Sequence, residues 1–257
     1  MTPAQPNYGN WIRKRILLVF LAVGSGALIG ALLPVPLAVR LVLLGISGLF
    51  LFGFVYFTYA YVQFSAQGGN LQTPLRNLVL DYLSWDGEGK ALDIGTGNGP
   101  LAIRLAQKYP HANVVGIDNW GKDWEYSRET CTRNAAIEQV GNRVQFQKAS
   151  AARLPFDDET FDAAVSHFVF HEVSDAPDKR DVIQEALRVL REGGVFSFHD
   201  LFLDEKIYGT VEDLLETIRS WGVQQVAFVE TGHQVHIPPL LRSRRVLGAT
   251  GIIYGVK

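Results

Sequence analysis

The stretch from Ala91 to Gly99 combines residue types that suit the binding of a nucleotide. It reads Ala-Leu-Asp-Ile-Gly-Thr-Gly-Asn-Gly, so Asp93 stands near the end of a short apolar run and three glycines follow it. Glycines in such a turn let backbone N–H groups approach a ligand that a Cβ atom would keep away. Nucleotide sites of several chemistries use glycine in this way, so the residues around the turn must identify the ligand.

The spacing of the glycines argues against a dinucleotide. A dinucleotide fingerprint has the pattern G-x-G-x-x-G, whereas here Gly95, Gly97 and Gly99 alternate and Pro100 stands in the place of the third glycine. The acidic residue two positions before the first glycine points the same way. Asp118 does not distinguish a dinucleotide from another nucleotide ligand, because a carboxylate at this position can bind the hydroxyls of any ribose. A nicotinamide-dependent oxidoreductase is therefore a disfavoured alternative.

The elements that must position the turn alternate along the chain. Short apolar runs predict strands at 90–94, 114–117, 144–148, 161–166, 195–198, 225–229 and 251–256, and apolar residues at helical spacing predict helices at 73–83, 101–109, 126–140, 181–190 and 211–221. Alternation of this kind implies right-handed crossovers. We therefore expect an α/β, Rossmann-like fold with a seven-stranded, mostly parallel sheet and helices on both faces. The ligand site then lies beyond the carboxyl ends of the strands.

The N-terminal part of the chain has the composition of a membrane anchor. No charge interrupts residues 16–33, and residues 41–62 form a second apolar run of about the length needed to span a bilayer. The sequence predicts two transmembrane helices, at about 16–36 and 38–62, joined at Pro34 and Pro36. A signal peptide is disfavoured because a second run follows at once, and neither run has the polar face of a soluble helix. The expected domains are an anchor over 1–66 and a soluble domain over 67–257.

Charge and cysteine content suggest where the soluble domain lies and what it binds. Arg13, Lys14 and Arg15 precede the first span and only Arg40 lies between the spans, so the positive-inside rule places the soluble domain in the cytoplasm of a two-span membrane protein. The single cysteine, Cys131, suits a reducing compartment. A net charge of −2 without a basic stripe argues against nucleic acid as a partner. No pattern indicates an oligomeric state.

Several further motifs follow the glycine turn in a fixed order. They are Val115–Asp118, Asn134-Ala135, Ala149–Phe156, Phe161–Ser166 with His171-Glu-Val173, and Ala186–Gly194. With Leu92–Gly99, this set resembles the class I S-adenosylmethionine-dependent methyltransferases, in particular the small-molecule branch that includes ubiquinone and menaquinone methyltransferases. The resemblance covers roughly residues 70–257.

The resemblance implies S-adenosylmethionine as the cofactor and a role for each matched residue. Gly95 and Gly97 would let the backbone approach the methionine and ribose portion, and Asp93 would orient the cofactor's amino group or the glycine turn. Asp118 would bind both ribose hydroxyls. Trp120 would stack on adenine or belong to the core. The implied cofactor-binding residues are Asp93, Gly95, Thr96, Gly97, Asn98, Gly99, Asp118, Asn119, Trp120, Ser150, Ala151 and Ser166.

One position departs from the family pattern. In the family an aspartate followed by a small residue often holds the adenine edge, and here Ser150-Ala151 takes that place. A hydroxyl can still bond the adenine amino group, but without charge assistance. This departure supports the second hypothesis, a non-catalytic membrane protein that uses a degenerate methyltransferase fold for interactions.

Two histidines are candidate catalytic bases. His171 follows the fourth predicted strand and His199 ends the fifth, so both should face the cofactor cleft, and imidazole is the usual group that takes a proton near pH 7. The alternative for each is a bond to a nearby carbonyl with no chemical role. No metal site is expected, since His199-Asp200 lacks the other ligands that a divalent ion requires. The main hypothesis is a membrane-anchored methyltransferase acting on a small, lipophilic acceptor that the sequence does not name.

Overall fold

The chain folds into two compact units, one of which is inserted into the other. The structure is a computed structural model that describes residues 4–121, 124–244 and 246–257. One unit contains the residues up to Gly9 together with Pro74–Lys257, and the second contains Asn10–Thr73. The division predicted from the sequence, at residue 66, differs from this one. Residues 4–9 belong to the α/β unit because Asn7 bonds to Asn134 in the helix Arg128–Ile137 and Tyr8 bonds to Glu138, the residue after that helix.

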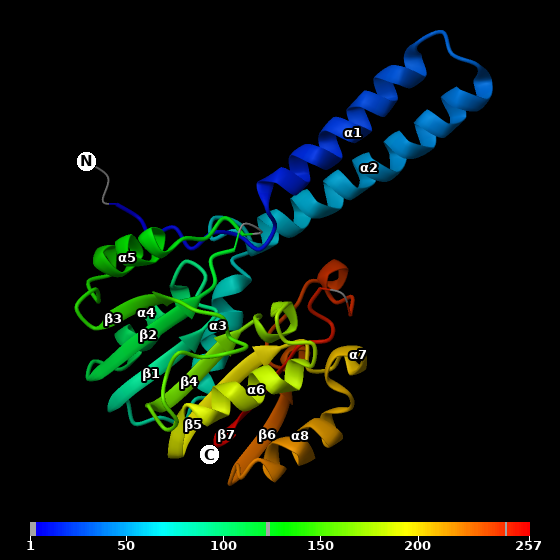
Figure 1. Ribbon diagram of the computed structural model, residues 1–257. Helices are drawn as coiled ribbons and strands as arrows, with labels where there is room; N and C mark the ends of the chain where they lie inside the picture. The colour runs from blue at the N-terminus through cyan, green and yellow to red at the C-terminus, as the bar shows by residue number, and fades with distance from the viewer. Residues whose placement is uncertain (1–3, 122–123, 245) are drawn as a thin grey trace. The chain divides into compact units, whose positions relative to one another are not determined.

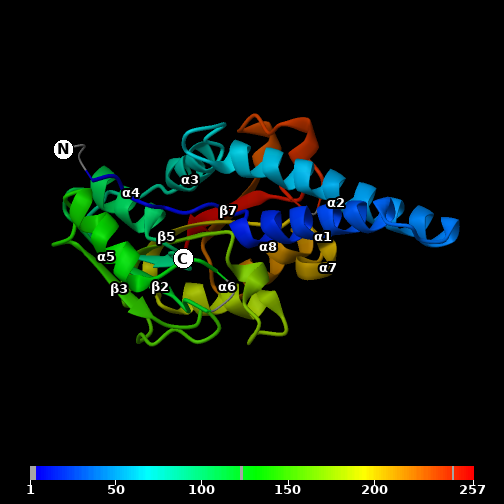
Figure 2. The same cartoon turned by 90° about the horizontal axis from the view of Figure 1, so that it is seen from above.

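The inserted unit is a hairpin of two long helices, α1 (Lys14–Leu32) and α2 (Leu37–Phe64), which lie side by side in Figures 1 and 2. Both are long and apolar enough to cross a membrane, and only 11% and 6% of their most apolar windows are buried. Helix α1 ends before the predicted residue 36, because Pro34 has no N–H to donate and disfavours helical geometry at Leu33. At Gly53 a Cβ atom would lie 2.3 Å from the ring of Phe20, so glycine permits the close packing.

The α/β unit is built on one seven-stranded sheet, which confirms the predicted fold class. The strand order is β3-β2-β1-β4-β5-β7-β6, and β7 runs in the direction opposite to that of the other six strands. The strands are β1 (Gly89–Ile94), β2 (Ala112–Asp118), β3 (Val144–Lys148), β4 (Phe161–His167), β5 (Leu190–Asp200), β6 (Gln225–Glu230) and β7 (Gly251–Val256). The carboxyl ends of β1, β2 and β4 therefore meet at one edge, where a ligand site is expected.

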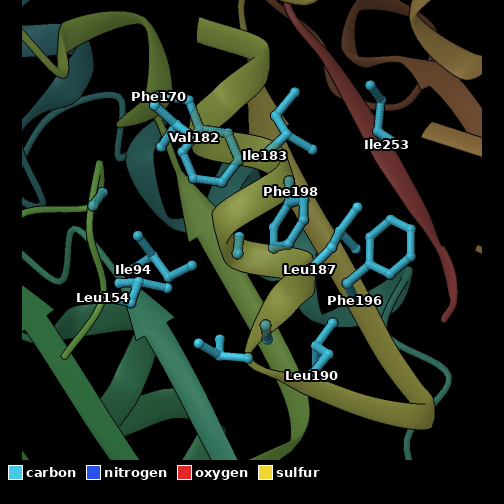
Figure 3. Close-up of a cluster of buried hydrophobic side chains, with 14 of the residues drawn as sticks. Ile94, Leu154, Phe170, Val182, Ile183, Leu187, Leu190, Phe196, Phe198 and Ile253 are labelled. Atoms are coloured by element: carbon cyan, nitrogen blue, oxygen red, sulfur yellow. The ribbon is translucent and has the colours of Figure 1, made fainter. Parts of the chain in front are cut away.

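Helices cover both faces of this sheet. Side chains alternate between the two faces along each strand, so each face carries its own cluster of buried apolar side chains. The helices are α3 (Gln72–Asp81), α4 (Pro100–Lys108), α5 (Arg128–Ile137), α6 (Lys179–Arg188), α7 (Glu205–Tyr208) and α8 (Val211–Ser220). Leu92 and Ile94 of β1 point into the cluster under α6 and α8, part of which Figure 3 shows, whereas Ala91 points into the cluster under α3, α4 and α5. Successive side chains of a strand point to opposite faces of the sheet, so a strand that is buried on both faces contributes to both clusters.

Local chemistry explains the ends of the elements next to the site. Helix α4 begins with Pro100 at its first position, after Gly99 at a φ of +85°. Helix α5 starts at Arg128 rather than at the predicted 126, because the Ser127 side chain accepts the Thr130 N–H. Strand β5 begins well before the predicted residue 195. The Gly193-Gly194 pair stays within the sheet since it exchanges backbone hydrogen bonds with Lys257.

Candidate active site

The glycine turn follows β1, and other residues approach its glycines to different extents. Gly95, Gly97 and Gly99 all have positive φ angles, and the N–H groups of Gly95 and Thr96 donate to the carbonyl of Ile117 at 2.9 and 2.8 Å. A Cβ atom at Gly95 would lie 2.1 Å from Val169. At Gly97 the nearest described atom would be 3.5 Å away. The protein therefore closes over Gly95, whereas a Cβ atom at Gly97 would make only ordinary van der Waals contact with the ring of Tyr126. This position, the cradle at Gly97, is where a ligand can approach the backbone.

Asp93 lies beneath the turn and holds it to α4. Its carboxylate is buried, and Oδ2 accepts from the Thr96 hydroxyl at 2.6 Å and from the Ala102 N–H at 3.0 Å. Burial raises the pKa of Asp93 to about 7. Of the two roles predicted for Asp93, these bonds describe the one that orients the turn.

Asp118 ends β2 and lies against the same turn. Its Oδ2 accepts from the Gly97 N–H at 2.8 Å and its Oδ1 from the Trp120 N–H at 2.7 Å. Burial raises the pKa of Asp118, against the effect of its backbone hydrogen bonds, including one from the exposed Asn119. Trp120 donates its indole N–H to the Gly97 carbonyl at 2.9 Å and packs partly against the core. Its stacking on adenine stays a prediction.

Ser150 has an acidic neighbour that its sequence position does not reveal. Its hydroxyl lies 2.6 Å from Oδ2 of Asp175 and donates to it, while its oxygen accepts the Ala152 N–H at 3.1 Å. Ser150 is half-buried and Asp175 is exposed in the loop before α6. The adjoining Ala151 is buried in the core. The sequence has no carboxylate at position 150, but the fold brings the carboxylate of Asp175, 25 positions away, next to Ser150.

Two predicted cofactor residues direct their polar atoms into the protein. The Ser166 side chain is buried, and its hydroxyl donates to the Ile94 carbonyl at 3.0 Å, which ties the ends of β4 and β1 together. Asn98 is buried between two glycines of the turn, where its side-chain oxygen accepts the Ser127 N–H at 3.1 Å. Both residues shape the site from behind.

His171 forms a pair with Asp200, which ends β5. Nδ1 of His171 lies 2.6 Å from Oδ1 of Asp200, and 19% of the histidine side chain is exposed. Burial acts to lower the pKa of His171, but the charge and hydrogen bond of Asp200 outweigh it and raise the pKa. Val169, on the same loop, packs over Gly95. This packing keeps the loop that carries His171 next to the glycine turn.

His199 is placed differently from His171. It is fully buried, with Nδ1 2.9 Å from Nδ1 of His167 and Nε2 2.8 Å from the Thr231 hydroxyl. Burial lowers the pKa of His199 to about 4, so its ring is neutral at physiological pH. The structure thus brings only His171 to the surface of the site, and both ring nitrogens of His199 already contact protein groups.

Sequence reasoning missed two other charged groups near the site. Asp200 is the partner that orients His171, although its sequence position marked it only as the end of a strand. Arg76 of α3 is buried, and burial lowers its pKa to about 10 while Tyr126, Tyr8 and Asp93 act in the opposite direction. An arginine inside an amphipathic helix carries no sequence signal that it faces the core.

Part of the α/β unit is similar to known proteins. Residues 92–198 match a family described as a methyltransferase domain. Because of this similarity, the α/β unit that contains these residues is referred to as the methyltransferase domain. A 27-O-demethylrifamycin SV methyltransferase from Amycolatopsis mediterranei is 35% identical over 149 residues, which are 58% of this chain and 52% of that protein. The ubiquinone/menaquinone biosynthesis C-methyltransferase UbiE from Desulfotalea psychrophila is 34% identical over 119 residues, 46% of this chain and 44% of that protein.

The extent of these similarities is limited. The chain spans about half of the length of these two curated relatives. A solved structure of geranyl diphosphate methyltransferase with GPP and sinefungin has a TM-score of 0.54 and 17% identity, and covers 74% of this chain and 80% of that one. That likeness shows the fold of the methyltransferase domain.

The cofactor of this domain class is S-adenosylmethionine, and the turn fits it. The cradle at Gly97 lets a ligand approach the backbone of the turn, where the N–H groups of the three glycines already donate to protein oxygens. Each Asp118 oxygen accepts a backbone N–H and retains lone pairs that can accept from ribose hydroxyls. The methyltransferase domain thus has a cradle and a carboxylate at the position where the fold binds its cofactor.

Proposed function

We propose that the protein is an S-adenosylmethionine-dependent methyltransferase that is anchored in a membrane and methylates a small, lipophilic acceptor. The observation that carries the proposal is the position of Asp118, whose carboxylate accepts the Gly97 N–H beside the cradle at Gly97. A ribose diol suits this carboxylate, and the polar part of a cofactor suits the glycine turn.

The reaction makes limited chemical demands on the chain. When bound, the cofactor supplies a methyl group that is already activated on a sulfonium. Positioning of the acceptor and exclusion of water then provide much of the rate, and a base is required only when the acceptor must lose a proton. A hydroxyl acceptor has this requirement. By its name, the Amycolatopsis relative methylates an oxygen, whereas UbiE methylates a carbon.

His171 is the residue best placed to remove such a proton. Asp200 accepts from Nδ1, so Nε2 is the nitrogen that can take a proton from an acceptor. The buried carboxylate stabilises the imidazolium that forms. His199, which is fully buried, would support this site from behind without contacting the acceptor.

The lipophilic acceptor is supported by two independent features. The name of the UbiE relative places its reaction in ubiquinone and menaquinone biosynthesis, and such acceptors dissolve in lipid. In addition, the large apolar side chains that are well exposed among the described residues all lie within 18–62, apart from Leu240. Burying this surface in a bilayer would stabilise the hairpin and hold the methyltransferase domain where such acceptors are found.

The proposed topology has two spans with the methyltransferase domain in the cytoplasm. The basic residues Arg13, Lys14 and Arg15 before α1 support this orientation. The inclusion of residues 4–9 in the α/β unit supports the two-span arrangement, because both ends of the hairpin must then lie on one side of the membrane. A reporter fused between Pro34 and Pro36 should be active on the outer side and one fused after Lys257 on the cytoplasmic side, and the reverse pattern would reject the orientation.

Cofactor binding is the first test of the proposal. The full chain in lipid nanodiscs should bind S-adenosylhomocysteine in isothermal titration, and Asp118→Ala should weaken binding while its thermal unfolding stays cooperative. The absence of binding by the wild-type protein at millimolar ligand would reject the proposal.

The second test concerns the acceptor. Incubating the nanodisc protein with a membrane lipid extract and the radiolabelled methyl donor should transfer label to a lipid-soluble product, which mass spectrometry identifies by the addition of one methyl group. Label found only in water-soluble products would reject the lipophilic acceptor, and retention of the activity by Asp118→Ala would assign it to a contaminant.

A further inference from the structure

The segment Asn7–Gly9, which precedes the hairpin in the sequence, bonds to residues of the methyltransferase domain that follow the hairpin. The side chain of Asn134 on α5 is fully buried and makes three hydrogen bonds. Its Oδ1 accepts from the Asn7 N–H at 2.9 Å, and its Nδ2 donates to the Asn7 carbonyl, also at 2.9 Å. The third bond runs from the same Nδ2 to the Asn98 carbonyl at 2.9 Å. One amide therefore links the N-terminal segment to the glycine turn.

The other residues of the segment fit the same surface. The Tyr8 hydroxyl donates to Oε1 of Glu138 at 3.1 Å, and its ring packs against the core cluster under α4 and α5. Gly9 has a φ of +74°, and its N–H donates to the Asn7 side chain at 3.1 Å. A Cβ atom at Gly9 would lie 2.8 Å from the ring of Tyr126. The segment is thus shaped to lie close to the methyltransferase domain.

The glycine turn depends on α5 through several contacts of this kind. The Gly97 carbonyl accepts from the Cys131 thiol at 3.1 Å, and Asn98 is held at both its carbonyl and its side chain. Without Asn7, two of the three bonds of Asn134 would be lost, and the amide that holds Asn98 would be free to turn toward water. Losing partners in a buried network has a larger effect than the single bonds suggest.

We infer that Asn7–Gly9 is a positioning element of the cofactor site, acting through Asn134 on the turn Gly97-Asn98-Gly99. The inference rests on the proposed binding of S-adenosylmethionine. It gives a role to the Asn134-Ala135 motif. Through Asn134, it makes the cofactor site depend on Asn7, which lies 127 positions before Asn134 in a segment that directly precedes the apolar hairpin. A fragment that begins after the hairpin would lack this element.

The test replaces Asn7 with proline in the full chain in nanodiscs. Proline has no N–H, so Asn7→Pro removes the donor to Asn134 at an exposed position without emptying the core. Gln5→Pro, at an exposed position two residues before this segment, is the matched control. Tyr8→Ala, which removes the ring and its bond to Glu138, is the second variant.

We expect Asn7→Pro and Tyr8→Ala to raise the Kd for S-adenosylhomocysteine about tenfold, as the loss of one or two net hydrogen bonds would do. Gln5→Pro should bind like the wild type. The KM for the methyl donor should rise while kcat and the KM for the acceptor change little, a split that a general loss of stability does not produce. Hydrogen exchange of residues 95–102 in the ligand-free protein should become faster in Asn7→Pro and Tyr8→Ala only.

The outcomes separate this inference from the proposed function. If the wild type binds the ligand and both variants bind it equally well, with unchanged exchange at the turn, the inference is overturned and the proposed function stands. If the wild type binds no ligand, the proposed function fails, and the assignment of this segment to a cofactor site fails with it.

Discussion

The imidazole of His171 and the carboxylate of Asp200 form a hydrogen-bonded pair, with Nδ1 2.6 Å from Oδ1. Asp200 is fully buried, and its Oδ2 accepts the N–H groups of Val169 and Phe170 at 3.1 and 2.8 Å. The carboxylate is therefore fixed by the loop that carries His171. A fixed carboxylate also fixes the tautomer of the ring, since only a protonated Nδ1 can donate to it.

Removal of the imidazole should reduce catalysis without reducing cofactor affinity. With a hydroxyl acceptor we expect His171→Ala to lower kcat by about 10²–10⁴-fold, the usual contribution of a general base. The Kd for S-adenosylhomocysteine should stay within a factor of about two, far less than the tenfold change that 1.4 kcal/mol would give. His199→Gln serves as the comparison, and a larger loss of kcat there than in His171→Ala would contradict the assignment.

The pH dependence of the reaction should report the His171–Asp200 pair. His171 must be neutral to accept a proton, so kcat/KM should rise with pH through an apparent pKa above the ordinary histidine value of about 6.5. In Asp200→Asn the opposing effect of burial remains while the charge is gone, so this pKa should fall below the ordinary value. Equal profiles for the wild type and Asp200→Asn would show that another group titrates.

Asp93 should act on the turn through hydrogen bonds rather than through charge. Because Oδ2 accepts both described bonds, Asp93→Asn retains an acceptor for Thr96 and Ala102, whereas Asp93→Ala leaves two buried donors unpaired. We expect Asp93→Ala to lower the free energy of unfolding by about 2 kcal/mol or more, and Asp93→Asn by about 1 kcal/mol or less. A tenfold loss of cofactor affinity in the well-folded Asp93→Asn would instead indicate a charge contact with the cofactor's amino group.

The same residue predicts a pH dependence of stability. Burial raises the pKa of Asp93 from 3.8 to about 7, so the folded state holds a proton that the unfolded state has released between these values. The contribution of Asp93 to stability is therefore present at about pH 4 and is lost as the pH rises toward 7. The Tm of the wild type should therefore fall between pH 4 and pH 7 relative to the Tm of Asp93→Asn. If the Tm values of the two proteins changed with pH in parallel, the shifted pKa would be contradicted.

The local pattern of apolar residues predicted the positions of individual strands. The predicted ranges of β3 and β7 agree with the structure, since apolar runs bounded by turns identify strands. Their order in the sheet has no such signal, and β7 lies antiparallel between β5 and β6. The extent of β5 was missed because its glycine pair is kept in the sheet by Lys257, the last residue of the chain.

In the candidate site, too, some features follow from local sequence patterns and others depend on the tertiary fold. The turn and Asp118 follow from glycine spacing and from the end of a strand, whereas Asn7 and Asp175 reach the site from distant, exposed positions. Contacts of this kind depend on how the finished fold brings loops together. The burial of His199 behind His171 likewise depends on which way each side chain leaves its strand or loop, and periodicity does not specify this for residues at strand ends.

Ser150 and Asp175 should together select adenine. With its proton donated to Asp175, the Ser150 hydroxyl can only accept, so it suits the amino group of adenine and not the carbonyl of hypoxanthine. The wild type should therefore bind S-adenosylhomocysteine more tightly than S-inosylhomocysteine. In Asp175→Asn the amide can donate to Ser150 and release the hydroxyl proton, so this preference should fall by about tenfold or less, given the exposure of Asp175.

Matched variants make this last expectation specific. Asp157→Asn removes another exposed carboxylate and should leave the preference unchanged. Ser150→Asp places a carboxylate directly at the adenine edge, so it should restore the preference in the Asp175→Asn background. A general distortion of the site would weaken both ligands equally, so only the ratio of the two Kd values reports this pair. An unchanged ratio in Asp175→Asn would show that Asp175 does not orient the hydroxyl.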